Sequence, residues 1–151
     1  MNNPMIRDDC NYSLNNYTLT DIQNTSVDFM LKRFSCLLNH QTGFGKTLIS
    51  LTGCQHCLNH SNNLQVVIVC PKPAVASFKK ELTNKLEQPY SIYTATEYKE
   101  VENARYHIFC YSKLSFLEDW LDNNSDISFI KGVAVKPQTI LKFLRKLARV
   151  L

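Results

Sequence analysis

The segment that decides the fold is residues 40–47, His40-Gln41-Thr42-Gly43-Phe44-Gly45-Lys46-Thr47. It follows the apolar run Cys36-Leu37-Leu38 and precedes Leu48-Ile49-Ser50-Leu51. We therefore expect a strand near residues 35–39, a loop, and a helix over residues 46–58. A strand, a glycine-bearing loop, Lys-Thr and a helix make up the layout of a phosphate-binding P-loop.

The residue types in this segment suit the binding of a triphosphate. Two glycines let the backbone curl so that successive N–H groups point at phosphate oxygens, and the helix adds the positive end of its dipole. Lys46 can reach the β- and γ-phosphates, and the Thr47 hydroxyl can bind Mg²⁺, so these two are the candidate catalytic residues. The expected nucleotide-binding residues of the segment are Thr42, Gly43, Phe44, Gly45, Lys46 and Thr47.

One departure from the usual P-loop pattern leaves an alternative open. The pattern begins with a glycine five positions before the glycine of the final Gly-Lys-Thr, and here that position falls on His40. A plain helix N-terminus with two flexible glycines would give the same letters.

Composition limits the class of protein and its partners. The chain has 151 residues, which suits one domain with a single core, and its 44% hydrophobic and 20% charged residues are typical of a globular protein. A net charge of +4 is compatible with a nucleic-acid partner. No apolar stretch approaches the roughly 18 residues of a membrane span, and the N-terminus has no secretory signal. We expect no membrane partner and a cytoplasmic or nucleoid-associated location, in the host cell if the chain is phage-encoded.

The cysteines raise the question of a metal. Cys54, Cys57 and His60 have part of the spacing of a zinc site, but the second half of such a set is missing. Reduced thiols are the expected state, with Cys36, Cys70 and Cys110 as small core residues in strand-like runs.

Strand and helix patterns alternate along the rest of the chain. Gln65-Val66-Val67-Ile68-Val69-Cys70 is an unbroken run typical of a strand buried on both faces. Further helices are expected over residues 21–33, 74–87, 114–121 and 137–151, and further strands over residues 91–94 and 106–111 and at residues 133–135, where the segment 126–135 ends. This alternation predicts an α/β fold, a three-layer parallel sheet flanked by helices, preceded by a loose arm over residues 1–17.

Four segments together resemble the first RecA-like domain of superfamily-two helicases, with the Swi/Snf-type DNA-dependent ATPases as the nearest branch. They cover roughly residues 17–135, and they are Tyr17 to Gln23 with Val27 to Met30, Leu38 to Thr47, Val67 to Pro73 with Phe78 to Leu82, and Ile108 to Leu114. The resemblance implies a P-loop NTPase fold, ATP and Mg²⁺ as cofactors, and DNA as a partner. It also implies a second motor domain or a partner chain.

The resemblance assigns roles to individual residues. Gln23 stands where the family reads the adenine edge, and the family's P-loop does not require the leading glycine that His40 replaces. Lys72, Tyr111 and Ser112 stand where relatives contact the DNA backbone. Phe78 stands where an aromatic residue packs a helix against the sheet.

The family's second acidic motif is missing from its expected place. A buried strand should end in Asp-Glu, of which the Asp holds Mg²⁺ and the Glu orients the attacking water. Here Lys131-Gly132-Val133-Ala134-Val135 is followed by Lys136-Pro137-Gln138-Thr139, and residues 131–151 contain no carboxylate side chain. The resemblance thus implies ATP-driven translocation on DNA, whereas this sequence predicts weak ATP binding and poor hydrolysis, which leaves its status as an enzyme open.

Residues 136–151 alternate basic and apolar side chains, which predicts a basic amphipathic helix after an incomplete RecA-like domain over residues 18–135. The helix could contact a membrane surface or a partner, or it could cover an exposed sheet face. A truncation or frameshift before the acidic motif is slightly favoured. The alternative function is a non-catalytic nucleotide- or DNA-binding module that acts through a partner.

Overall fold

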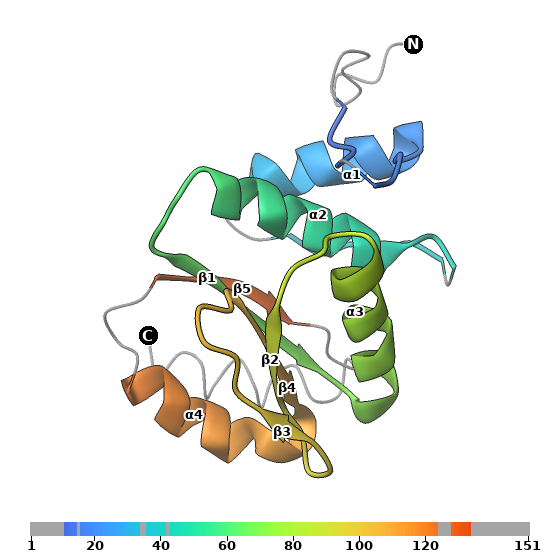
Figure 1. The fold of residues 1–151 in the computed structure, drawn as a ribbon. Coiled ribbons are helices and arrows are strands. Elements are labelled where there is room, and N and C mark those ends of the chain that lie inside the picture. Colours follow the sequence, from blue (N-terminus) through green and yellow to red (C-terminus); the bar gives the residue numbers. More distant parts are fainter. Residues whose placement is uncertain (1–10, 15, 34–35, 42, 124–127, 134–151) are drawn as a thin grey trace. The chain divides into compact units, whose positions relative to one another are not determined.

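A computed structural model describes residues 11–14, 16–33, 36–41 and 43–123, and the backbone of residues 128–133 (Figure 1). The chain divides into two compact units, each described by itself. The first unit is Met1–Asn62 with Lys80–Glu87, and the second unit is Asn63–Lys79 with Gln88–Leu151. The predicted helix over residues 137–151 lies outside the described residues.

The first unit is built on two helices, α1 (Asp21–Leu31) and α2 (Lys46–Asn59), which lie side by side (Figure 1). Thr20 and Gln23 form a capping box at the start of α1, in which each side chain accepts a hydrogen bond from the other residue's backbone N–H. This box satisfies two of the N–H groups that a helix end would otherwise leave unpaired. The predicted start of this helix is confirmed, and its end at Leu31 comes two residues earlier than expected.

Part of the expected loose arm is anchored on these helices. The Tyr12 hydroxyl donates to Asp28 Oδ1 over 2.6 Å, and Asp28 is a buried residue of α1 that also pairs with Lys32. The Tyr17 hydroxyl lies 2.6 Å from Thr52 Oγ1 on α2. The prediction of a loose arm is therefore wrong for Tyr12 and Tyr17, because their hydroxyls satisfy polar groups on both helices.

The second unit contains a five-stranded sheet in the order β3-β2-β4-β1-β5. Four strands run parallel, and β3 is an antiparallel edge strand. Their bounds are β1 Leu64–Cys70, β2 Tyr90–Tyr93, β3 Tyr98–Lys99, β4 Tyr106–Cys110 and β5 Ser128–Val133. The α/β class and the mostly parallel sheet flanked by helices are confirmed.

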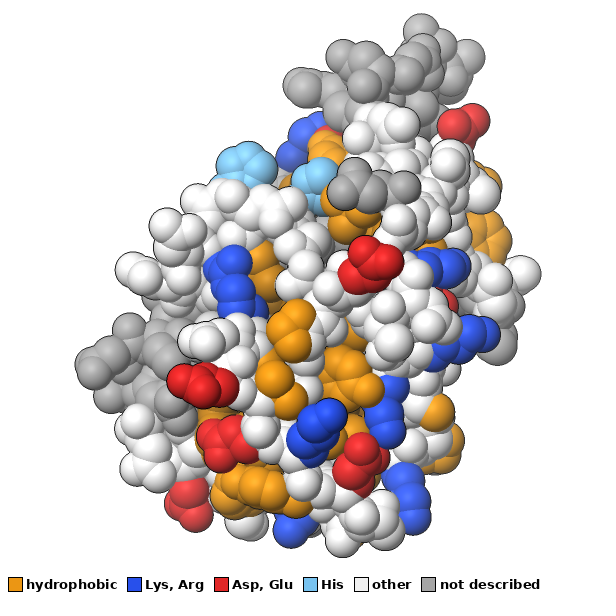
Figure 2. All heavy atoms as spheres, viewed as in Figure 1, with side chains coloured by type: hydrophobic (Ala, Val, Ile, Leu, Met, Phe, Trp, Pro, Cys, Tyr) orange, Lys and Arg blue, Asp and Glu red, His pale blue; other side chains and the backbone are white. Residues whose placement is uncertain are grey.

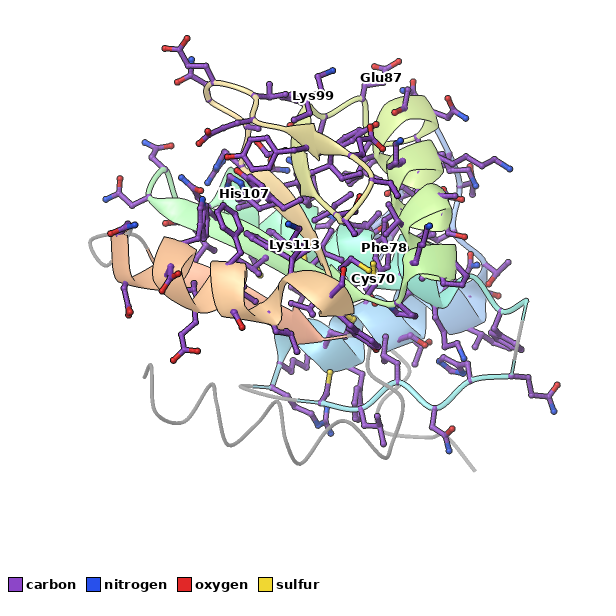
Figure 3. All side chains as sticks on the ribbon, turned by 90° about the horizontal axis from the view of Figure 1, so that it is seen from below. Cys70, Phe78, Glu87, Lys99, His107 and Lys113 are labelled. Carbon is purple, nitrogen blue, oxygen red and sulfur yellow. The ribbon has the colours of Figure 1, made fainter. Side chains whose placement is uncertain are left out.

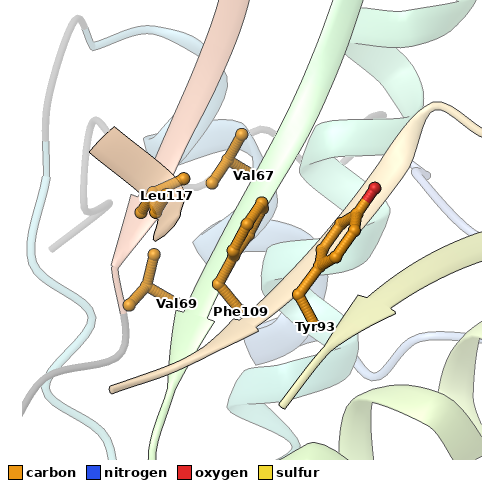
Figure 4. Close-up of a cluster of buried hydrophobic side chains, with 5 residues drawn as sticks. All are labelled: Val67, Val69, Tyr93, Phe109 and Leu117. Carbon is orange, nitrogen blue, oxygen red and sulfur yellow. The ribbon is translucent and has the colours of Figure 1, made fainter. Parts of the chain in front are cut away.

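One face of the sheet packs against α4 (Leu114–Asn123). Figure 4 shows the core cluster there, made by Val67, Val69, Tyr93, Phe109 and Leu117. The residues that alternate with them in β1, Val66 and Ile68, are also buried, as the unbroken apolar run predicts. Burial of each of these side chains contributes about 1.5–3 kcal/mol, so the central strands supply much of the stability of this unit.

The expected strand at residues 35–39 is wrong for its described residues, 36–39. Cys36 is exposed rather than in the core, and the Leu37 side chain is 80% exposed. A strand needs a partner for its backbone groups, and residues 36–39 are paired with no strand in the described part of the chain. An apolar run of three residues does not reveal whether such a partner exists.

Other boundaries differ by small shifts. Helix α3 covers Lys72–Asn84 rather than residues 74–87, because Pro73 lies in its first turn, where a missing N–H costs nothing. Its far end is followed by Glu87, which has a left-handed φ of 51° that stops a helix. The two-residue strand β3 and the short 3₁₀ helix η1 (Tyr111–Lys113) were not expected. Strand β5 begins at Ser128, earlier than the strand expected at residues 133–135, of which Ala134 and Val135 lie outside the described residues.

Candidate nucleotide and nucleic-acid sites

The glycine loop has the backbone shape that the sequence predicts. Gly43 and Gly45 have left-handed φ values of 86° and 78°, and the Phe44 N–H donates to the Gln41 carbonyl over 3.3 Å. Gly45 is the N-cap of α2, whose first intrahelical bond runs from Ile49 N to Gly45 O over 3.0 Å. The N–H groups of the first turn therefore face the loop, and among described residues no side chain caps this terminus.

Lys46 and Thr47 occupy the first two positions of α2. The exposed Lys46 side chain turns back over the loop, and its Nζ donates to the His40 carbonyl over 2.8 Å. Thr47 is half-buried beside it. Thr42 lies outside the described residues. The loop-to-helix half of the expected junction is thus present, while the preceding strand is not.

Gln23 contacts the same loop from α1. Its Nε2 donates to the Phe44 carbonyl over 3.2 Å, and its Oε1 accepts from Thr20 N over 3.0 Å. A carboxamide has two N–H donors and two acceptor lone pairs, so one of each remains. The second N–H donor and the second acceptor lone pair of Gln23 match the donor and acceptor that adenine presents on one edge.

Two contacts of the loop were missed by sequence reasoning. His40 Nε2 lies 2.8 Å from Ser26 Oγ on α1, and the His40 ring stacks on Phe44 with centroids 4.9 Å apart and planes 10° apart. The sequence does show that Gln23 and Ser26 are three residues apart, so they lie on one face of α1. This spacing alone does not predict that the glycine loop packs against that face.

The residues expected to contact DNA gather at one edge of the sheet in the second unit. Lys72 begins α3 just after β1, and Tyr111 and Ser112 lie in η1 just after β4. Strands β1 and β4 are parallel neighbours with Cys70 opposite Cys110, so both segments leave the sheet at its carboxyl edge. In Figure 3 the label Cys70 marks the end of β1, and the label Lys113 marks the end of η1, which follows β4. Lys72 and Ser112 are exposed, and Tyr111 is half-buried.

Two observations concern residues 72–79, the part of α3 that belongs to the second unit. Phe78 is 8% exposed, in keeping with the packing role that the resemblance gives it. Lys79 pairs with Glu97, in the loop after β2, over 3.0 Å. The burial of Phe78 and the ion pair of Lys79 fix the part of the helix that carries Lys72, whereas the Lys72 side chain is exposed.

The cysteines do not assemble a metal centre in the described part of the chain, where no group of three His, Cys, Asp or Glu side chains is placed to hold an ion. Cys54 is buried, and burial raises the pKa of its thiol to about 12. Metal binding needs the thiolate, which this environment disfavours. Cys70 and Cys110 are buried as expected.

Basic and acidic side chains are interspersed on the face shown in Figure 2, without a large block of one sign. A nucleic-acid contact on this face would therefore depend on a few positioned groups rather than on a broad basic surface.

The two loop glycines are expected to differ in their tolerance of alanine. A left-handed φ costs an alanine about 1–2 kcal/mol at either position. An added Cβ at Gly45 would also lie 2.7 Å from Gln23 Nε2, whereas nothing lies within 4 Å of one at Gly43. Gly45→Ala should therefore be less stable than Gly43→Ala by about 1 kcal/mol, the value of the displaced hydrogen bond. Urea unfolding of the two variants measures this difference, and equal stabilities would contradict the close approach of Gln23 Nε2 to Gly45.

A glycine loop that leads into a lysine-headed helix, in a chain with a mostly parallel sheet, defines a P-loop nucleotide-binding α/β protein. Residues 11–132 match the family model described as "Type III restriction enzyme, res subunit", and the chain belongs to that family. This confirms the resemblance to the N-terminal RecA-like domain of a superfamily-two helicase. Comparison with individual curated proteins finds no match. Among the described helices, none has the length and apolar character needed to span a bilayer.

Proposed function

We propose that this chain is the ATP-binding part of a DNA-dependent ATPase or helicase, and that it binds Mg-ATP through residues 40–47. The observation that carries the proposal is the placement of Lys46 Nζ over a loop with two left-handed glycines at a helix start. Membership of a helicase-like family supports ATP as the nucleotide. Titration of a fluorescent ATP analogue tests the proposal, with Lys46→Ala as the decisive variant.

In this proposal each part of the site has a separate task. The N–H groups of the loop and of the first turn of α2 hold the phosphate oxygens, and Lys46 moves from the His40 carbonyl to the β- and γ-phosphates. The remaining donor and acceptor of Gln23 read adenine. Thr47 is the residue that would hold Mg²⁺, which supplies charge neutralisation on the phosphates when bound.

Hydrolysis is expected to be slow because residues 134–151, which follow β5, contain no carboxylate side chain. This strand runs parallel to β1 with Val66 opposite Ile130, so β5 and β1 end at the same carboxyl edge of the sheet. The next residues in the sequence are Ala134-Val135-Lys136-Pro137, which provide no group to orient a water. This observation favours the second candidate function, a nucleotide- or DNA-binding module without catalysis. Salt-dependent DNA binding without ATP turnover would favour that module.

The carboxyl edge of the sheet is proposed to contact the DNA backbone. Replacing Lys72 with alanine should weaken binding of a DNA duplex at every sequence tested and reduce the slope of log K against log salt by about 0.9, the value for one phosphate contact. Lys99→Ala is the matched control, since Lys99 is an exposed lysine of the second unit on edge strand β3. Fluorescence anisotropy at several salt concentrations measures both slopes. Equal slopes for the two variants would remove Lys72 from the contact.

A further inference from the structure

Four side chains join the glycine loop to helix α1, and we call this set the loop clamp: Gln23, Ser26, His40 and Phe44. Gln23 holds the Phe44 carbonyl, Ser26 holds the His40 ring, and the ring of His40 stacks on that of Phe44. Because Gln23 and Ser26 are one turn apart on α1, the helix grips both ends of the loop. His40 is the central member, because its ring contacts both Ser26 and Phe44.

The hydrogen bonds of Ser26 fix the tautomer of His40. Ser26 Oγ has one proton and donates it to the Ile22 carbonyl over 2.9 Å. It therefore accepts from His40, whose Nε2 carries the proton in the neutral ring. Ser26 is 6% exposed, so loss of its partner leaves a buried oxygen with one bond fewer.

The His40 backbone has its own part in the site, since its carbonyl accepts from Lys46 Nζ. The contacts of the His40 side chain fix the position of the His40 carbonyl. They therefore also fix where the Lys46 ammonium lies before a triphosphate binds. We propose that His40 is a positioning residue of the nucleotide site, which fixes the glycine loop to α1 through Ser26 and Phe44. This inference rests on the proposed nucleotide binding. It adds His40, which occupies the place of the usual leading glycine, to the residues of that site.

Variants of His40 separate the two contacts of its ring. His40→Phe keeps an aromatic ring against Phe44 and loses the bond to Ser26, whereas His40→Ala loses both. We expect His40→Ala to bind Mg-ATP about tenfold more weakly, from the loss of one hydrogen bond and one ring stack, and His40→Phe to fall between it and the wild type. Ser26→Ala should match His40→Phe, and the two changes together should be no worse than either, because they remove the same bond. His60→Ala, an exposed histidine after α2, is the control and should bind like the wild type.

Two readouts separate positioning from a general loss of stability. In ¹⁵N-histidine NMR spectra, which contain four imidazoles, the His40 signals should show the Nε2–H tautomer, and Ser26→Ala should shift those signals alone. Amide hydrogen exchange of Phe44 should speed up in His40→Ala while exchange within β1 stays unchanged.

The outcomes distinguish this inference from the proposed function. Normal Mg-ATP affinity and unchanged exchange in His40→Ala, while Lys46→Ala loses binding, would overturn the role of His40 and leave the nucleotide site intact. A wild type that binds no Mg-ATP would overturn the proposed function, and with it the role of His40 in nucleotide binding.

Discussion

Alanine in place of Lys46 is expected to weaken binding of Mg-ATP by about 10- to 150-fold, the range for loss of hydrogen bonds to a charged group. The ammonium is the one formal charge that the described loop and the first turn of α2 offer to a triphosphate. Its present partner is a neutral carbonyl, that of His40, which a phosphate oxygen would replace at little cost. Because the side chain is exposed, stability should stay within about 0.5 kcal/mol of the wild type.

The matched control is Lys80→Ala, an exposed lysine on α3 in the same unit. Titration with inorganic triphosphate and with adenosine then shows whether the lost affinity belongs to the phosphates or to the base. Lys46→Ala should lose affinity for triphosphate and keep that for adenosine, because the proposed contact of the base is with Gln23 and not with the lysine. Equal affinity of wild type and Lys46→Ala for the fluorescent ATP analogue would reject the P-loop assignment.

The features that sequence predicts well here are encoded locally. The helix expected from residue 21 does begin there, directly after the N-cap residue Thr20. The run from Val66 to Val69 has no polar residue to face water, so it lies in the centre of the sheet. Lys46 starts a helix because Gly45 can adopt the left-handed backbone of its N-cap.

The features that sequence missed depend on partners far along the chain. Leu37 and Leu38 suit a strand as well as many strand residues do, but a strand also needs a neighbour with unpaired backbone groups. His40 and Ser26 are separated by 14 residues, and neither has a local pattern that announces their bond. The residues proposed to contact DNA lie between these cases, since the parallel sheet alone brings Lys72 and Ser112 to one edge once the strands are known.

The other large effect concerns a buried histidine of the sheet. His107 lies on β4 with 6% of its surface exposed, and its Nε2 donates to Gln65 Oε1 over 2.5 Å. Its Nδ1 is buried without a hydrogen-bond partner in the described part of the chain. Burial lowers the pKa of His107 from 6.5 to about 4, because a proton on Nδ1 would bring a charge into apolar surroundings beside Trp120.

The sign of the pH effect follows from this lowered pKa. Between about pH 6.5 and pH 4 the unfolded chain binds a proton at His107 and the folded chain does not, so acid favours unfolding. The contribution is fully present above pH 6.5 and is lost as the pH falls towards 4, by on the order of 3 kcal/mol in all. Trp120 is the only tryptophan of the chain and its ring lies 4.7 Å from that of His107, so its fluorescence reports unfolding of this part of the chain.

Replacing His107 with glutamine should flatten this dependence. A glutamine keeps an N–H for Gln65 and cannot titrate, so the variant should lose much less stability than the wild type between pH 7 and pH 4.5. Carboxylates titrate in both proteins, and the difference between the two curves isolates His107. His60→Gln, at an exposed position, should follow the wild type. If urea unfolding gave parallel curves for wild type and His107→Gln, the imidazole would already be charged or solvated in the folded chain, and its burial beside Trp120 would be wrong.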